Sequence, residues 1–288
     1  IMHYILTLFI LGSPIITDAQ TGFTGLQISR GARPAAMGDI GTAMIGPEIS
    51  NPAAIPIGSG RDYIFSHTSW IQDIEQDNIH LIYKRPSQSW GVHAHTWRSD
   101  ELEYRTSASK DPLGAFGLYE FTLGISHVRK IQNKIRAGTR ISFLRQGIYD
   151  SDATGWTMDI GILHFFRPKQ HWGISLLNFG QITPLDRVST RLPTELQIGL
   201  FNQHGQKFQT IFEMHKTDES EISLHLGTAY RFNKKITLRC GYQNLTNRML
   251  SLGASLMLNS WHLDYSHQPF RDNLGHVHRI NLRMGTGQ

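Results

Sequence analysis

Residues Ile222–Phe232 read ISLHLGTAYRF, and nearly every second side chain in this stretch is apolar. The apolar set is Ile222, Leu224, Leu226, Tyr230 and Phe232. The positions between them hold Ser223, His225, Gly227 and Arg231. Successive side chains of a β-strand point to opposite faces of the sheet, so this stretch predicts a strand with one apolar and one polar face.

The same alternation recurs along most of the chain. It is clearest in five further stretches, at residues 135–143, 236–242, 252–258, 261–265 and 280–284. Weaker examples predict strands at residues 62–70, 78–85, 89–98, 102–108, 119–129, 155–166, 171–177, 194–202 and 207–216. We therefore expect fourteen or fifteen strands, and no helix longer than a turn or two after Arg61.

Two all-β architectures fit such strands: a soluble sandwich with its apolar face inward, and a membrane barrel with its apolar face outward. Three features favour the barrel. The connections at 233–235 and 259–260 are short, whereas those at 178–193, 244–250 and 268–275 are long. Aromatic residues lie near strand ends on the apolar face, and the other face carries glycine and both signs of charge. We predict a transmembrane antiparallel β-barrel of about 14 strands over residues 61–288.

Composition excludes several other classes of protein. The chain has 288 residues, 18% of them charged, and a mean hydropathy of −0.28, which excludes a helical membrane protein. The net charge of +5 is mild and no basic stripe is present, so we expect no nucleic-acid binding. The single cysteine, Cys240, permits neither an intrachain disulfide nor a paired-cysteine metal site.

The first sixty residues differ from the rest. Residues 4–16 form a short apolar run followed by Thr17-Asp18-Ala19, which predicts a signal peptide over residues 1–19. The alternative is a buried N-terminal strand. Residues 20–60 are rich in Gly, Ala, Pro and Ile and alternate poorly, which predicts a plug or hatch associated with the barrel. The alternative for this segment is a flexible linker.

Strand parity assigns a set of charged residues to the lumen of the predicted barrel. These are Arg136, Arg140, Asp159, Glu195, Arg231, Arg239, Asp264, Arg279 and Arg283. Buried charges are tolerated when they pair or meet water. The set therefore predicts a lattice of ion pairs that rigidifies the barrel, or alternatively an anion-attracting path or a dock for the hatch.

Two groups of residues are candidates for chemical sites. His93 and His95 share one face of a strand, but two ligands do not make a metal site and no third is identifiable. Asp264 and Ser266 share a face from which His267 points away, and the chain has no G-x-S-x-G motif. We therefore predict no metal site, no cofactor and no enzyme activity.

The N-terminal segment carries Gly31-Ala-Arg-Pro-Ala-Ala-Met-Gly38 and Asn51-Pro52-Ala53. These motifs resemble the N-terminal signature of the PorV/PorQ family, which is related in fold to the FadL transporters. Further similar motifs follow in order, including Leu192-Pro193 and Leu263-Asp264-Tyr265, and the resemblance spans about residues 22 to 284. The signature residues are Gly31, Arg33, Pro34, Gly38, Asn51, Pro52 and Ala53.

The resemblance implies a monomeric FadL-like barrel in the outer membrane of a Gram-negative bacterium, surrounded by outer-membrane lipid. It also implies a role in type IX protein secretion, with the C-terminal domains of secreted cargo or secretion and attachment components as partners. The alternative is a FadL-like uptake channel for hydrophobic small molecules. An adaptor needs apolar external loops, for which 178–193 and 268–275 are candidates, whereas a transporter needs a pocket that leads to the lumen.

Overall fold

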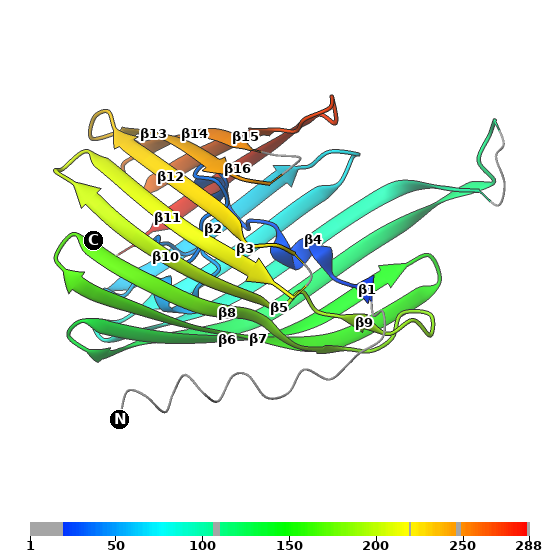
Figure 1. The fold of residues 1–288 in the computed structure, drawn as a ribbon, viewed down its shortest axis with the longest axis horizontal. Helices are drawn as coiled ribbons and strands as arrows, with labels where there is room; N and C mark the ends of the chain where they lie inside the picture. The colour runs from blue at the N-terminus through cyan, green and yellow to red at the C-terminus, as the bar shows by residue number, and fades with distance from the viewer. Residues whose placement is uncertain (1–19, 106–109, 219, 246–248, 287–288) are drawn as a thin grey trace.

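The structure, a computed structural model, describes residues 20–105, 110–218, 220–245 and 249–286. The predicted signal peptide lies outside the described residues. Fourteen antiparallel strands form one closed barrel, with β16 hydrogen-bonded to β2 (Figure 1). The prediction of an all-β barrel of about 14 strands is confirmed.

The barrel strands follow one another around the wall in chain order. The first seven are β2 (Gly60–Ser69), β3 (Glu75–Lys84), β4 (Gln88–Tyr104), β5 (Gly114–Gln132), β6 (Ile135–Ile148), β7 (Ser151–Arg167) and β8 (Gln170–Ile182). The other seven are β10 (Glu195–His204), β11 (Phe208–Thr217), β12 (Ser223–Arg231), β13 (Ile236–Gln243), β14 (Leu250–Leu258), β15 (Trp261–Pro269) and β16 (His276–Gly285). Outside the barrel, β1 (Gln20–Thr21) pairs in parallel with β9 (Thr190–Arg191).

Two strand predictions were wrong in their limits. The stretches predicted at 89–98 and 102–108 belong to one strand, β4, which ends at Tyr104; residues 106–108 lie outside the described residues. A register shift between Ser99 and Leu102 interrupts this strand and breaks the alternation. The strand predicted at 171–177 continues to Ile182 as β8. The pairing of β7 with β8 has a second register shift, between Met158 and Ile160. Asn178 of β8 lies at this shift and has a positive φ of 58°, a value typical of turns.

The two faces of the wall differ as the alternation predicts. Outward side chains are largely apolar and exposed, for example Phe65, Ile125 and Leu252. The aromatic residues Trp156, Tyr230, Phe232, Tyr242, Trp261 and Tyr265 are all exposed on this face. The inner face carries buried polar residues and glycines. An apolar belt around a polar interior is the arrangement that lipid requires of a barrel.

The two ends of the barrel also differ. Short turns at 133–134, 168–169 and 259–260 lie at one end, which we call the turn end. Longer connections at 105–113, 183–194 and 270–275 lie at the other, the loop end. The β4–β5 hairpin projects beyond the rest of the wall at the loop end (Figure 1).

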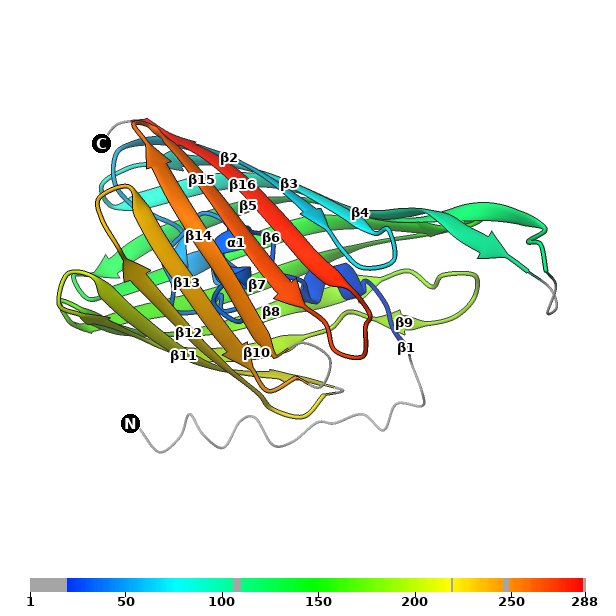
Figure 2. The same ribbon diagram turned by 90° about the horizontal axis from the view of Figure 1, so that it is seen from above.

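Residues 22–59, which we call the inner segment, lie inside the barrel (Figure 2). They contain only short helices: η1 (Thr24–Gln27), α1 (Ala32–Ala35) and η2 (Pro52–Ala54). In the described part of the chain, no helix is long and apolar enough to cross a membrane. Left-handed φ angles at Phe23, Gly38 and Asp39 prevent regular structure from extending between the helices.

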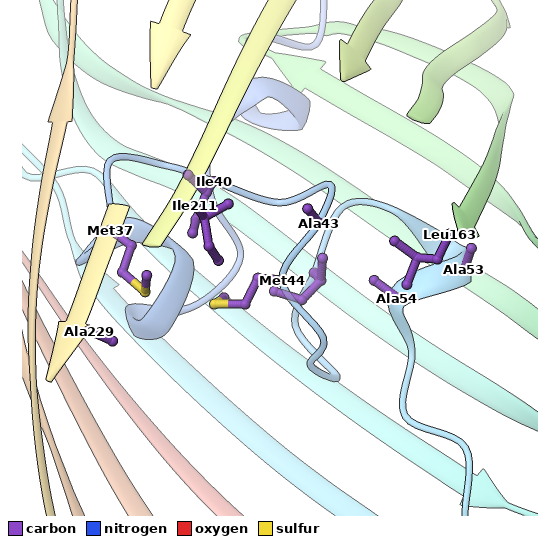
Figure 3. Packing of buried hydrophobic residues seen from close by; sticks show 10 residues of the cluster. Met37, Ile40, Ala43, Met44, Ala53, Ala54, Leu163, Ile211 and Ala229 are labelled. Atoms are coloured by element: carbon purple, nitrogen blue, oxygen red, sulfur yellow. The ribbon is translucent and has the colours of Figure 1, made fainter. Parts of the chain in front are cut away.

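The inner segment forms the apolar core of the molecule together with the wall. Met37, Ile40, Ala43 and Met44 pack with small residues of η2 and with wall residues such as Ile211 (Figure 3). Leu163 and Ala229 extend this cluster from β7 and β12. The middle of the barrel is therefore filled by residues of the inner segment, where apolar and polar residues do not alternate.

Candidate functional site

The site that the fold defines is the inner segment together with the barrel residues that hold it. Asn51 organises one end of this contact. Its Oδ1 accepts a hydrogen bond from the Ala53 N–H at 2.9 Å, which caps η2, and its Nδ2 donates to the Thr42 carbonyl at 2.8 Å. The Asn-Pro-Ala turn is thus fixed within the segment itself.

Two wall glycines make room for this turn. A Cβ at Gly138 of β6 would come within 2.4 Å of the Ala53 nitrogen, and a Cβ at Gly161 of β7 would come within 1.8 Å of Asn51 Oδ1. Gly138 and Gly161 are direct cross-strand partners. The wall therefore has a seat for the turn that no larger residue would leave open.

The Gly31–Gly38 motif contacts the opposite wall. The Ala32 N–H at the start of α1 donates to Asn281 Oδ1 at 3.0 Å, and the Gly38 N–H donates to Ser251 Oγ at 3.0 Å. Gly38 has a φ of 81°, and a Cβ there would come within 2.8 Å of the Tyr242 carbonyl oxygen. Arg33, the charged member of the motif, forms an ion pair with buried Glu48 at 3.4 Å.

Glu213 of β11 holds the middle of the inner segment. Its carboxylate accepts the N–H groups of Gly41, Thr42 and Ala43 at 2.9, 2.9 and 2.8 Å. It also accepts from His215 Nε2 at 3.0 Å. Three converging N–H groups on one fully buried carboxylate form an anion nest, with the anion supplied by the wall. Each such hydrogen bond to a charged group contributes about 1.5–3 kcal/mol.

Arg140 and Asp159 are direct cross-strand partners that also hold the segment. The guanidinium donates to Asp159 Oδ2 at 3.0 Å and to the carbonyls of Ile49 and Ser50 at 2.9 and 3.0 Å. Asp159 accepts in addition from the Asn178 N–H at 2.8 Å. Both side chains are only 3% exposed, so the pair is enclosed between the wall and the segment.

The structure places the other predicted lumen charges on the inner face. Glu195 pairs with His215 Nδ1 at 3.3 Å, and Arg239 approaches Asp264 at 3.8 Å. Arg279 is fully buried and hydrogen-bonds to Gln268. Arg136 lies 4.8 Å from the centre of the Phe165 ring. The remaining two, Arg231 and Arg283, face the lumen near the turn end.

Two cavities flank the inner segment. The loop-side cavity, of about 210 Å³, lies between the segment and the β6–β12 part of the wall and is lined by Arg30, Asp39, Glu48, Asp159 and Glu195 among others. The turn-side cavity, of about 430 Å³, is lined by Arg33, Lys207, Arg231, Lys234, Lys235, Arg239 and Arg283. Among the described residues that line the turn-side cavity, Asp264 is the one carboxylate.

The residues weighed for metal binding and catalysis do not form such sites. His93 and His95 are buried on the inner face, where their Nε2 atoms contact Ser142 and Gln76. Among the described residues, no group of three His, Cys, Asp or Glu side chains could hold a metal ion. Asp264 and Ser266 are buried inside, whereas His267 bonds to His276 on the outer face.

Sequence reasoning missed several residues that build the site. Two of them, Glu213 and Asn281, contact the inner segment from the wall. Two others belong to the segment itself: Glu48, which pairs with Arg33, and Arg30, which lines the loop-side cavity. Glu213 had a usable signal, because it lies between apolar Phe212 and Met214 on the polar face of its strand. Arg30 and Glu48 lie outside the strands, so the alternation of side chains does not predict which way they point.

The solved structures most informative for this fold are outer-membrane channels. The Pseudomonas putida toluene transporter TodX superposes with a TM-score of 0.66 at 11% identity, over 90% of this chain and 97% of that one. The CymD monoaromatic hydrocarbon channel gives 0.63 at 14% identity, over 90% and 97%. A Pseudomonas aeruginosa FadL homologue gives 0.59 at 11%, over 89% and 98%. No family model and no curated protein matches the chain.

These similarities establish a FadL-like barrel fold. At identities this low, they carry the fold and not the ligand.

Proposed function

We propose that the protein is an outer-membrane uptake channel of the FadL type for small organic molecules. The observation that carries this proposal is the inner segment, which fills the middle of a closed barrel and separates a loop-side cavity from a turn-side cavity. The structural neighbours named as toluene and monoaromatic hydrocarbon channels support uptake over secretion, and they favour a ligand with an apolar body.

In this proposal the inner segment acts as the hatch. A ligand enters the loop-side cavity, and the segment must shift before the ligand reaches the turn-side cavity. The hydrogen bonds that Glu213 accepts from the segment, and those that Arg140 donates to it, hold the closed position. These contacts are buried in the closed position, and water can replace them when the segment moves.

A reversible lock tests this function. Thr42 Oγ1 of the segment lies 3.3 Å from Ser175 Oγ of β8, so Thr42→Cys with Ser175→Cys places two thiols on either side of the contact. Liposomes that contain the barrel should take up radiolabelled toluene or benzoate faster than protein-free liposomes when the thiols are reduced, and no faster when they are oxidised. Thr42→Cys alone, with Cys240→Ser in both variants, is the control. If each compound enters as fast with the oxidised variant as with the reduced one, the hatch does not have to move for uptake.

A second candidate is an adaptor of the PorV/PorQ type in type IX secretion. The observation that favours it is the projecting β4–β5 hairpin, where Tyr104 and Leu113 are exposed, with Tyr104 stacked on Tyr149 at 5.6 Å. Such a surface suits a protein partner, including the C-terminal domain of exported cargo. Affinity purification from the native outer membrane, followed by mass spectrometry, tests it. Co-purified exported proteins that share a C-terminal domain would favour the adaptor over the channel.

A further inference from the structure

The carboxylates that line the loop-side cavity already have partners. Asp159 is paired with Arg140 at 3.0 Å and Glu48 with Arg33 at 3.4 Å. The other two follow the same rule: Glu195 contacts His215 at 3.3 Å, and Asp39 accepts from Ser29 Oγ at 2.6 Å and from Gln268 at 3.2 Å. None of these acids is left to bind a cationic ligand alone.

Arg30 is different. It lines the same cavity and is 8% exposed, yet among the described residues its side chain has no hydrogen-bond or ion-pair partner, and its Nη1 is fully buried. Burial lowers the pKa of Arg30 to about 10, which still leaves the guanidinium charged at neutral pH. A buried charge without a partner costs several kcal/mol. Water or a bound anion must therefore satisfy this group.

The unpaired charges of the turn-side cavity have the same sign as Arg30. The seven cationic side chains of this cavity are opposed by one lining carboxylate, Asp264, which is engaged by Ser255 and Arg239. Among the described residues, the side chains of Arg231 and Arg283 have no ion-pair partner. A cavity lined by one sign of charge concentrates counter-ions several-fold or more. The unpartnered charges on both sides of the inner segment are thus cationic.

We propose that the ligand of this channel is a small organic anion, whose charged group binds Arg30 in the loop-side cavity and then passes into the turn-side cavity. This inference rests on the proposed uptake function and specifies its substrate class. A neutral hydrocarbon of the same shape would displace water from the Arg30 guanidinium without replacing its hydrogen bonds, and so would bind less tightly. A cation would be repelled by the unpaired charge of Arg30, and the four carboxylates of the lining already have partners.

Three compounds with the same ring separate these charges: benzoate, toluene and benzylamine. Isothermal titration of the full barrel in lipid nanodiscs should show benzoate binding most tightly. Arg30→Met should weaken benzoate binding roughly tenfold or more, because it removes the charge-assisted hydrogen bond to the carboxylate. Arg30→Lys should retain most of the affinity. Arg129→Met, which removes an exposed arginine of β5, is the matched control.

The outcomes separate the inference from the function. Tighter binding of toluene than of benzoate, or benzoate binding unchanged in both Arg30→Met and Arg30→Lys, would overturn the anion assignment. Liposome uptake of the same compounds tests the function independently. The reference in each case is entry into protein-free liposomes, because toluene crosses a bilayer by itself. Faster entry of toluene, but not of benzoate, through the barrel would leave the channel standing and refute its anion class. Entry of none of the three compounds above this reference would refute the uptake function, and the transport inference with it.

Discussion

The two cavities beside the inner segment use charge in different ways. In the loop-side cavity, Asp159, Glu195 and Arg140 are tied into hydrogen bonds with the wall or the segment, and Arg30 alone is left over. In the turn-side cavity, the charges are nearly all of one sign and several face open space. Charges that are paired hold the segment in place, whereas in the proposed channel the charges that are not paired act on the ligand. The two roles can therefore be changed separately.

The largest effect is expected where a paired, buried charge is removed. Asp159→Asn leaves Arg140 enclosed without its counter-charge, and breaking such a pair costs about 3–5 kcal/mol of the free energy of unfolding. Glu75 and Arg98 also lie directly opposite each other on neighbouring strands, as Arg140 and Asp159 do, but their side chains are 45% and 51% exposed. Glu75→Gln should therefore cost much less of the free energy of unfolding than Asp159→Asn. Urea unfolding in lipid vesicles, followed by tryptophan fluorescence, measures both.

A similar loss in the two variants would contradict this view of the loop-side cavity. It would mean that water reaches the Arg140–Asp159 pair and screens it as at the surface. The two cavities would then differ in the number of their charges but not in what those charges do.

A somewhat smaller effect is expected at the nest made by Glu213. Glu213→Gln keeps the size of the side chain but removes the charge that receives the N–H groups of Gly41, Thr42 and Ala43. Losing the charge assistance should cost about 2 kcal/mol. Hydrogen exchange of these three amides should accelerate, while the amides of β5 stay protected. Unchanged exchange would show that the segment is held by apolar packing alone.

The contrast between wall and segment also explains what sequence could predict. Parity placed Arg140 and Asp159 inside the barrel, because a strand with one face toward lipid must alternate. It could not pair them, since pairing depends on the register between β6 and β7. It could not find the Glu213 nest either, because the partners are 170–172 residues apart and three of the four groups are backbone. Main-chain donors leave no mark in the sequence.

Overpacking the seat of the Asn-Pro-Ala turn should move the segment without touching any charge. Gly138→Ala places a Cβ about 2.4 Å from backbone atoms of Pro52 and Ala53, so the turn must shift. We expect a loss of about 1–3 kcal/mol and faster liposome uptake than in the unmodified barrel. Gly58→Ala, which meets no atom within 4 Å, is the control within the same segment. Slower uptake with a stable barrel would mean that the seat is not part of the gate.

The smallest effect on stability, and the sharpest on selectivity, is expected in the turn-side cavity. Arg231→Gln with Arg283→Gln removes two charges that have no ion-pair partner among the described residues, so stability should change by less than about 0.5 kcal/mol. In the Gly138→Ala background, planar-bilayer recordings in a salt gradient should show a reversal potential shifted toward cations. Replacing the exposed Lys130 and Lys134 by Gln gives a charge-matched control outside the cavity lining. An equal shift in both double variants would mean that only the net charge of the protein matters, and that the turn-side cavity does not contribute to ion selectivity.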